Sequence, residues 1–413
     1  MAAPGDRIDT LDLIRGIAVC GILAINILGF AGPVTATLSP HLPDPGTHAD
    51  ELAFAASFVV FEGKMRALFT ILFGAGLILF VDRAEAVGRD GTALQLRRLG
   101  WLALLGYLHY ALFWWGDILF LYAVVGVMAL ALRQMPDRGA VGAALALFAA
   151  WHLAGAAGSI DAVIAEEQVR TGTASLAQGR QHATNVAAFT TYTAQNLAEI
   201  RAGFGEQLYQ RLIGDPGWPI RMAFATVGET LPLMLIGMAL YRGGFFSGGW
   251  PRRRLWLLGL GGTALGLVPT LAAAAWLLDR GWPTIAAEAA IAEWMALPHL
   301  AMALGYAALI ALAAPALLKT GLGRRLAAAG RMALTNYIAC TIAMTATFYG
   351  WGLGLAGSVP DRAYPLFVAA GWLAMLGWSA PWLMRFRHGP LEWLWRCLTG
   401  GKRLPFARAC YCD

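Results

Sequence analysis

Apolar segments long enough to cross a bilayer are the feature that most limits how this chain folds. About ten occur, at 13–33, 65–82, 98–115, 117–133, 139–158, 222–241, 254–278, 298–318, 331–355 and 364–384. A helix of about 20 apolar residues crosses the hydrocarbon core, where the backbone must satisfy its own hydrogen bonds. We therefore predict an all-α fold, a polytopic membrane helix bundle of about ten transmembrane helices.

The charged residues agree with this prediction in number and in position. Only 14% of the residues are charged, whereas soluble proteins carry about 25%. With the N-terminus in the cytoplasm, the short cytoplasmic connections hold most Lys and Arg residues and the short outside ones almost none, as in other membrane proteins. We therefore predict that both termini are cytoplasmic, that the protein lies in a bacterial inner (cytoplasmic) membrane and that the lipid bilayer is a partner. The basic residues are spread over many loops, which argues against nucleic-acid binding.

The connections divide the chain into four parts. Residues 1–158 form a five-helix membrane region, and residues 222–403 form a second one. Between them, 159–221 is polar and predicts two or three amphipathic helices on the extracytoplasmic (periplasmic) side, as a lid or simply a cap. Residues 404–413 form a short cytoplasmic tail, and the preceding 389–402 has the apolar and basic side chains of an interfacial helix.

One histidine and one aspartate are the strongest candidates for catalysis. His109 lies about two turns below the outer end of the third apolar segment, and Asp117 lies in the turn that follows it. A histidine there can exchange protons near neutral pH, and a nearby carboxylate would fix its tautomer, as in general-base catalysis. Structural roles are equally compatible with these positions: Asp117 as a helix N-cap, and His109 bonded to a backbone carbonyl.

Four further polar residues are candidates for binding a substrate. Asn26 lies deep in the first segment, and Glu229 lies about two turns into the sixth. Lys64 and Arg66 enter the second segment from outside, where binding an anion and anchoring at lipid headgroups are equally plausible. A charge at the bilayer centre costs about 2.5–3.5 kcal/mol, so Glu229 needs a partner such as Arg66, Lys64 or His109.

Polar residues on the cytoplasmic side are candidates for binding a cofactor. Arg15 lies in the first segment, and Arg331 and Asn336 begin the ninth. They could meet a phosphate or a pantetheine chain, but snorkelling of Arg15 and interhelical bonding by Asn336 are alternatives. The sequence contains no Walker, Rossmann, GxSxG, HExxH or CxxC motif, and we predict no metal.

Five blocks in series resemble the YeiB-like bacterial membrane proteins. They are LDLIRGIAVCGILAINILGF, KMRALFTILFGAG, RRLGWLALLGYLHYALFWWGDILFLYAVVG, GRMALTNYIACTIAM and GPLEWLWRCLTGGK. The resemblance runs from about residue 7 to 403, and the C-terminal domain of unknown function of that family would cover roughly 235–403.

That family is similar to the transmembrane acyltransferase superfamily, which includes lysosomal heparan glucosaminide acetyltransferases and O-acetylases of surface sugars. The resemblance implies a bundle of ten or eleven helices, an acyl-CoA donor entering from the cytoplasm, and an acceptor on the far side. It also implies a membrane-embedded histidine, which here points to His109 with Asp117 beside it. The acetyltransferases carry their histidine near the first helix pair, where this chain has Asn26 and Ile27.

We therefore expect an inner-membrane acyltransferase with acyl-CoA as co-substrate and a small-molecule acceptor. The alternative is a transporter or exporter of a small polar or anionic metabolite, with Glu229 and His109 as proton carriers. A third possibility is a scaffold or sensor that meets a partner through 159–221. Helix faces with small residues would also permit a homodimer.

Overall fold

The computed structural model describes residues 8–408, and this part of the chain is helical, with no strand. This confirms the predicted all-α fold. The α-helices are α1 (Asp9–Ala31), α2 (His48–Val60), α3 (Lys64–Glu85), α4 (Gly91–Leu112), α5 (Leu119–Ala131), α6 (Asp137–Thr171), α7 (Leu176–Arg201), α8 (Phe204–Tyr209), α9 (Trp218–Ala225), α10 (Val227–Arg242), α11 (Arg252–Asp279), α12 (Thr284–Ala289), α13 (Ala296–Leu317), α14 (Gly321–Arg331), α15 (Ala333–Phe348), α16 (Tyr364–Arg385) and α17 (Pro390–Gly400). Four short 3-10 or π segments are η1 (Val34–Thr37), η2 (Gln210–Gly214), η3 (Ala290–Trp294) and η4 (Asp361–Ala363).

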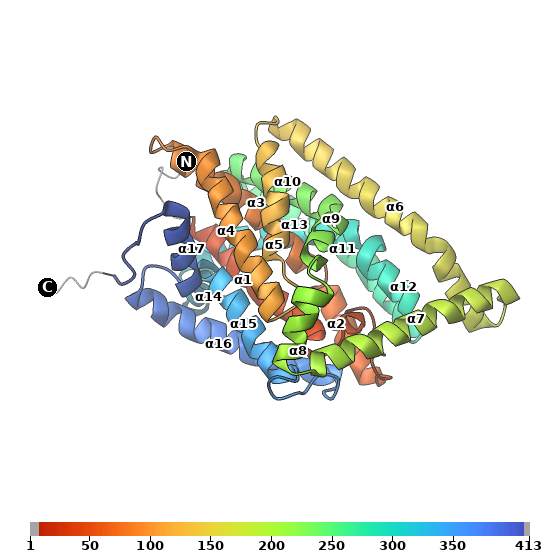
Figure 1. Ribbon diagram of the computed structural model, residues 1–413. Helices are drawn as coiled ribbons and strands as arrows, with labels where there is room; N and C mark the ends of the chain where they lie inside the picture. Colours follow the sequence, from red (N-terminus) through yellow and green to blue (C-terminus); the bar gives the residue numbers. More distant parts are fainter. Residues whose placement is uncertain (1–7, 409–413) are drawn as a thin grey trace.

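Two helices form the centre of the bundle. α1 packs against α3, α14, α15 and α16, and α3 also packs against α4, α10 and α13. Figure 1 shows α6 and α7 as long helices at the edge of the molecule, with α17 and α12 at opposite ends. The centre therefore brings together helices from both predicted membrane regions.

Each predicted apolar segment overlaps a helix, but 222–241 covers the end of α9 and most of α10, 331–355 runs past the end of α15, and the helices differ in length. Within residues 8–408, six helical stretches are long and apolar enough to cross a membrane: Asp9–Ala31, His48–Glu85, Asp137–Thr171, Arg252–Asp279, Ala296–Leu317 and Asp361–Arg385. α9 and α10 would add a seventh span, bent by 66°. α5 and α15 are apolar but have only 13 and 16 residues. The chain is thus a helical membrane protein in which α5 and α15 are too short to cross alone.

Pairs of glycines let the central helices touch through their backbones. A Cβ atom on Gly16 of α1 would lie 1.9 Å from the carbonyl oxygen of Leu326, and one on Gly330 of α14 would lie 1.9 Å from that of Asp12. Small residues at helix contacts allow such approach in membranes. Arg15 directly precedes Gly16 in the sequence, and Arg331 directly follows Gly330. The contact between α1 and α14 therefore places both arginines at the same end of the bundle.

The polar region 159–221 is helical and is tied to the bundle. α6 continues without a break through residue 158, and α7 follows it. Asn196 accepts a hydrogen bond from the backbone N–H of Val34 at 2.8 Å, and both Nε and Nη2 of Arg201 donate to the carbonyl of Ala356. α7 is therefore fixed across the end of the bundle opposite α17.

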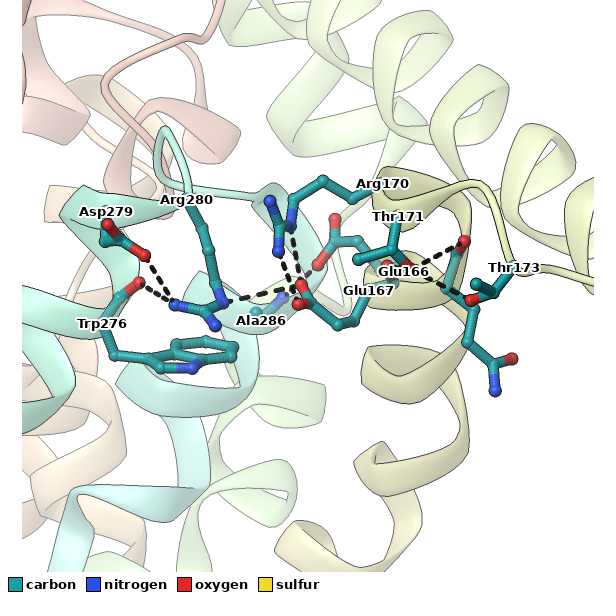
Figure 2. A network of polar contacts seen from close by, with 10 residues as sticks. Glu166, Glu167, Arg170, Thr171, Thr173, Trp276, Asp279, Arg280 and Ala286 are labelled. Carbon is teal, nitrogen blue, oxygen red and sulfur yellow. Dashed lines mark hydrogen bonds and ion pairs between the residues drawn. The ribbon is translucent and has the colours of Figure 1, made fainter.

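A network of charges fastens the outer end of α6 to α11 and α12 (Figure 2). The carboxylate of Glu166 accepts hydrogen bonds from the backbone N–H groups of Ile285 and Ala286, at 3.1 and 2.8 Å. Arg280 lies 3.5 Å from a carboxylate oxygen of Glu167 and 3.1 Å from one of Asp279. The charges of this network are therefore paired within the protein.

Candidate functional site

Two adjoining cavities open at the end of the bundle that carries α17. We call the wider one, of about 520 Å³, the vestibule, and the narrower one, of about 330 Å³, the inner branch. Arg15, Arg98 and Arg331 line both, so the two form one continuous space. Its walls come from α1, α3, α4, α5, α14, α15, α16 and α17.

The lining of this space is strongly basic. Among the described lining residues, the only carboxylates are Asp12 and Glu392. Asp12 lies 3.1 Å from Arg15, which partly neutralises it. The excess of positive charge favours a ligand with several negative charges. The basic lining residues are Arg15, Arg83, Arg89, Arg98, Arg331, Arg387, Arg396 and Lys402.

The second carboxylate, Glu392 of α17, is held by the start of α15. It accepts hydrogen bonds from the backbone N–H of Thr335 at 3.0 Å and from its hydroxyl at 2.5 Å. Burial raises the pKa of the Glu392 carboxyl above its ordinary value, and the bonds from Thr335 oppose this effect. Glu392 thereby fixes α17 as one wall of the vestibule.

Among the described residues, Arg98 is held by aromatic rings and not by a carboxylate. Its guanidinium lies 4.7 Å from the ring centre of Phe80 and 4.1 Å from that of Trp395. The indole N–H of Trp395 also donates to the backbone carbonyl of Arg98 at 2.9 Å. Stacking fixes the plane of a guanidinium and leaves its N–H edges for an anion.

The inner branch is mostly apolar and leads from the arginines toward the centre of the bundle. Phe69, Leu72, Phe73, Leu77 and Leu102 line it. Such a lining accepts a slender, largely uncharged chain.

Two tyrosines close the inner end of this branch. Tyr122 shares a hydrogen bond of 2.7 Å with the hydroxyl of Thr70, and Tyr337 donates to the carbonyl of Gly116 at 3.2 Å. Tyr337 lines the branch and its ring centre also lies 5.1 Å from that of His109. His109 therefore lies directly behind the inner end of the cavity.

His109 and Asp117 form a buried pair. Nδ1 of His109 lies 2.8 Å from Oδ1 of Asp117, and each side chain is only 1% exposed. A carboxylate partner at Nδ1 favours the tautomer whose lone pair is on Nε2. Nε2 of His109 is buried and has no hydrogen-bond partner within residues 8–408. The pair thus has the arrangement of a general base with an orienting carboxylate.

The local sequence explains how the pair is positioned. The other oxygen of Asp117 accepts a hydrogen bond from the backbone N–H of Phe120 at 2.7 Å, so Asp117 caps the start of α5 as well as binding His109. A Cβ atom on Gly106 would lie 2.8 Å from this carboxylate and 2.3 Å from the N–H of Phe120. Gly106 therefore allows the close approach of α5 to α4 that the pair needs.

The predicted substrate residues of α3 and α10 lie apart from the cavity lining. Arg66 and Glu229 form an ion pair of 3.0 Å, which supplies the partner that Glu229 was predicted to need. Lys64 is fully buried, and its ammonium donates to the backbone carbonyl of Phe58 at 2.7 Å. None of the three lines the vestibule or the inner branch.

The remaining predicted residues divide into two groups. Arg15 and Arg331, predicted to bind a cofactor, line both cavities. Asn26 and Asn336 instead line a separate void of about 10 Å³ beside Tyr337. Asn336 is hydrogen-bonded on both sides of its amide, to Ala329, Ser379 and Trp378, which is the interhelical role considered above.

Gln95, Arg98 and Tyr337 are site residues that sequence reasoning missed. At about 100° per residue, Gln95, Arg98 and His109 share one face of a helix, which was the available signal. This shared face was not recognised because the predicted third segment began at residue 98, whereas α4 begins at Gly91. The sequence could not place Tyr337 beside His109, since the two residues lie in helices that are far apart in the chain.

Comparisons with known proteins place the chain in a family. Residues 240–402 match the model described as "Protein of unknown function (DUF418)". The chain is 32% identical over 397 residues to the uncharacterized protein YeiB of Escherichia coli (strain K12), covering 95% of this chain and 96% of that protein. The chain belongs to the YeiB family. It is also 29% identical to the uncharacterized protein YxaH of Bacillus subtilis (strain 168), over 98% of this chain and 96% of YxaH. This confirms the YeiB-like resemblance; no solved structure matches.

Proposed function

We propose that this YeiB-family protein is a membrane-bound acyltransferase. It takes an acyl group from acyl-CoA on the cytoplasmic side of the bacterial inner membrane and transfers it to an acceptor on the opposite side. In this proposal the α17 end of the bundle, with both termini, faces the cytoplasm. The observation that carries it is the buried His109–Asp117 pair directly behind an arginine-lined cavity.

The charge and shape of the cavity support CoA as the donor. CoA has a nucleotide head with several phosphate charges, which suits the arginines that the vestibule shares with the inner branch. Its pantetheine arm is slender and uncharged, which suits the inner branch.

The length of the pantetheine arm also supports the proposal. Arg98 and His109 lie about 16 Å apart along α4, at 1.5 Å per residue. About twelve bonds separate the phosphate oxygen from the sulfur of pantetheine, and an extended chain gains about 3.5 Å for every three bonds, or about 14 Å in all. A diphosphate held at the level of Arg98 would therefore put the thioester near His109.

His109 would act as the general base for the transfer. Nε2 takes the proton from an acceptor hydroxyl or amine as its oxygen or nitrogen attacks the thioester carbonyl carbon. The tetrahedral intermediate expels the CoA thiolate, which receives that proton from the imidazolium. Asp117 holds the imidazole through Nδ1 and stabilises its charged form. Tyr337 lies between His109 and the inner branch, so its side chain must turn away to admit the thioester.

The test is binding and turnover of acetyl-CoA by the purified protein in detergent. We expect saturable binding, and release of the CoA thiol when a membrane lipid and glycan extract supplies acceptors. In His109→Ala, binding should persist and thiol release should fall about 10²–10⁴-fold, the usual contribution of general-base catalysis. The control is His48→Ala, because this histidine side chain is 75% exposed at the other end of the bundle. Full turnover by His109→Ala would disprove the proposed role.

The Arg66–Glu229 ion pair favours transport as a second candidate. An ion pair between α3 and α10 that lies off the cavity has no part in acyl transfer, but it could carry a proton across the membrane. Uptake of an organic anion into proteoliposomes, driven by a pH gradient and lost in Glu229→Gln, would support this function. Absence of any acetyl-CoA binding would make it the leading proposal.

A further inference from the structure

Gln95 is a buried amide that the proposed reaction does not use. It is 1% exposed and lines the inner branch near its junction with the vestibule. Its Oε1 atom has no hydrogen-bond partner in the part of the chain that the structure describes. Burying a carbonyl without a partner costs more free energy than a typical hydrogen bond contributes. An N–H or O–H group of a ligand is therefore the natural partner of Oε1.

The position of Gln95 along α4 indicates which part of a donor it meets. It lies one turn beyond Arg98 on the side away from His109, about 21 Å from His109 along the helix axis. This exceeds the reach of the pantetheine arm, about 14 Å when extended. If the thioester is at His109 and the diphosphate near Arg98, Gln95 faces the nucleoside end of CoA.

The surroundings of Gln95 suit a flat base. α17 lies against this part of α4, because the indole of Trp395 donates to the carbonyl of Arg98. Trp395, Gly400 and Leu404 line the same cavity as Gln95 and provide aromatic, small and aliphatic surfaces. Aromatic and apolar side chains hold a base by its face, and polar groups then read its edge.

We propose that the space between α4 and α17 is a nucleoside subsite and that Gln95 reads the edge of an adenine there. A glutamine amide is complementary to adenine: Oε1 accepts from the exocyclic amine, and the amide N–H₂ donates to a ring nitrogen. A base with oxygen in place of that amine would present an acceptor to Oε1 and would bind less well. The subsite rests on the proposed function, since it assumes that acyl-CoA is the donor.

The experiment compares two donors on two forms of the full-length protein. The donors are acetyl-CoA and its deaminated analogue, in which the 6-amino group of adenine is an oxygen. The proteins are wild type and Gln95→Met, which keeps the side-chain length but removes the amide. Gln181→Met is the matched control, because Gln181 lies on the exposed face of α7 and bonds only Asn185 among the described residues.

We expect the wild type to bind acetyl-CoA about three- to tenfold more tightly than the analogue, the range of one hydrogen bond. In Gln95→Met the two dissociation constants should become equal, while Gln181→Met keeps the difference. Thermal melting checks that Gln95→Met is folded, which we expect because the variant removes an unpaired buried oxygen.

The outcomes separate the two proposals. If the wild type binds acetyl-CoA but does not distinguish the analogue, or if Gln95→Met still distinguishes it, the nucleoside subsite is wrong and the acyltransferase proposal stands. If the wild type binds no acetyl-CoA, the proposed function fails and the subsite with it. Faster turnover of acetyl-phosphopantetheine on an acidic carrier protein than of acetyl-CoA would also overturn the subsite, because that donor has no nucleoside.

Discussion

Several arginines at the end of the bundle opposite α17 are paired with carboxylates, whereas basic residues outnumber carboxylates in the described lining of the cavities at the α17 end. At the first end, Arg280 lies between Glu167 and Asp279, and Arg362 lies 3.0 Å from Asp50. At the α17 end, Arg98 contacts aromatic rings, and Asp12 and Glu392 are the only carboxylates among the described lining residues of the cavities.

The difference separates charges that join parts of the fold from charges that line a cavity. A paired charge at the first end closes a contact between helices and contributes to stability. Around the cavity, the positive charges outnumber the carboxylates of the described lining, and their summed field attracts an anion. Removing a paired charge at the first end should therefore lower stability, whereas removing an arginine of the cavity should lower the affinity for an anion.

The largest effect is expected from removing the carboxylate that caps α12. Glu166→Ala leaves the backbone N–H groups of Ile285 and Ala286 buried without a partner, at about 1–3 kcal/mol each. We expect the thermal midpoint in detergent to fall clearly, with no change in the affinity for acetyl-CoA. Arg170→Ala, in an exposed pair with Glu167, should leave both unchanged. If Glu166→Ala also weakened the affinity for acetyl-CoA, the distinction between the two ends of the bundle would be wrong.

A smaller effect, on affinity alone, is expected at the α17 end. Arg98→Ala removes a charged donor from the cavity, so the dissociation constant for acetyl-CoA should rise about tenfold or more, and less at high salt. Isothermal titration at two salt concentrations measures the dissociation constant and its dependence on salt. The matched control is Arg97→Ala, since the exposed neighbour Arg97 does not line either cavity. An equal loss in both variants would show that general surface charge, and not the cavity, binds the donor.

The smallest effect is a pH dependence at the wall of the vestibule. Burial raises the pKa of Glu392 in the folded state above its unfolded value. This group therefore favours folding most at a pH below its ordinary pKa of 4.5, and its contribution is lost as the pH rises through the raised value. Glu392→Gln should flatten the change in melting temperature between pH 4.5 and pH 7. A slope unchanged from wild type would assign the pH dependence to other groups.

The helices and the His109–Asp117 pair could be predicted because both depend on short-range sequence. Apolar length identifies a membrane helix, and a tight turn between two helices returns a residue eight positions later to the same level. The Arg66–Glu229 pair could be anticipated only as one of three options for Glu229, because packing of α3 on α10 decides between them. The number of membrane spans was harder to predict, because α5 and α15 are short helices inside longer apolar stretches of the sequence.

The cavity itself could not be predicted, because it is formed between helices that are distant in sequence. Gln95 and Arg98 were assigned to a loop or to a helix end, where an arginine ordinarily indicates topology. The aromatic surroundings of Arg98 form only in the folded protein, where α17 places Trp395 over its guanidinium. Lys64 was predicted either to bind an anion or to anchor its helix at lipid headgroups, but α2 provides the carbonyl of Phe58 for its ammonium. These outcomes depend on tertiary contacts that no local pattern encodes.

The glycine contact between α1 and α14 has a consequence for electrostatics. Gly16 and Gly330 set how closely two helix backbones approach, and Arg15 and Arg331 are their immediate neighbours in sequence. The strength of the field at the mouth of the cavity therefore depends on the absence of two methyl groups. An alanine at either position carries no charge and would touch no ligand, yet by spreading the helices it would dilute the local charge density. In this protein, the distance between two helix backbones therefore affects how strongly the cavity attracts a distant anion.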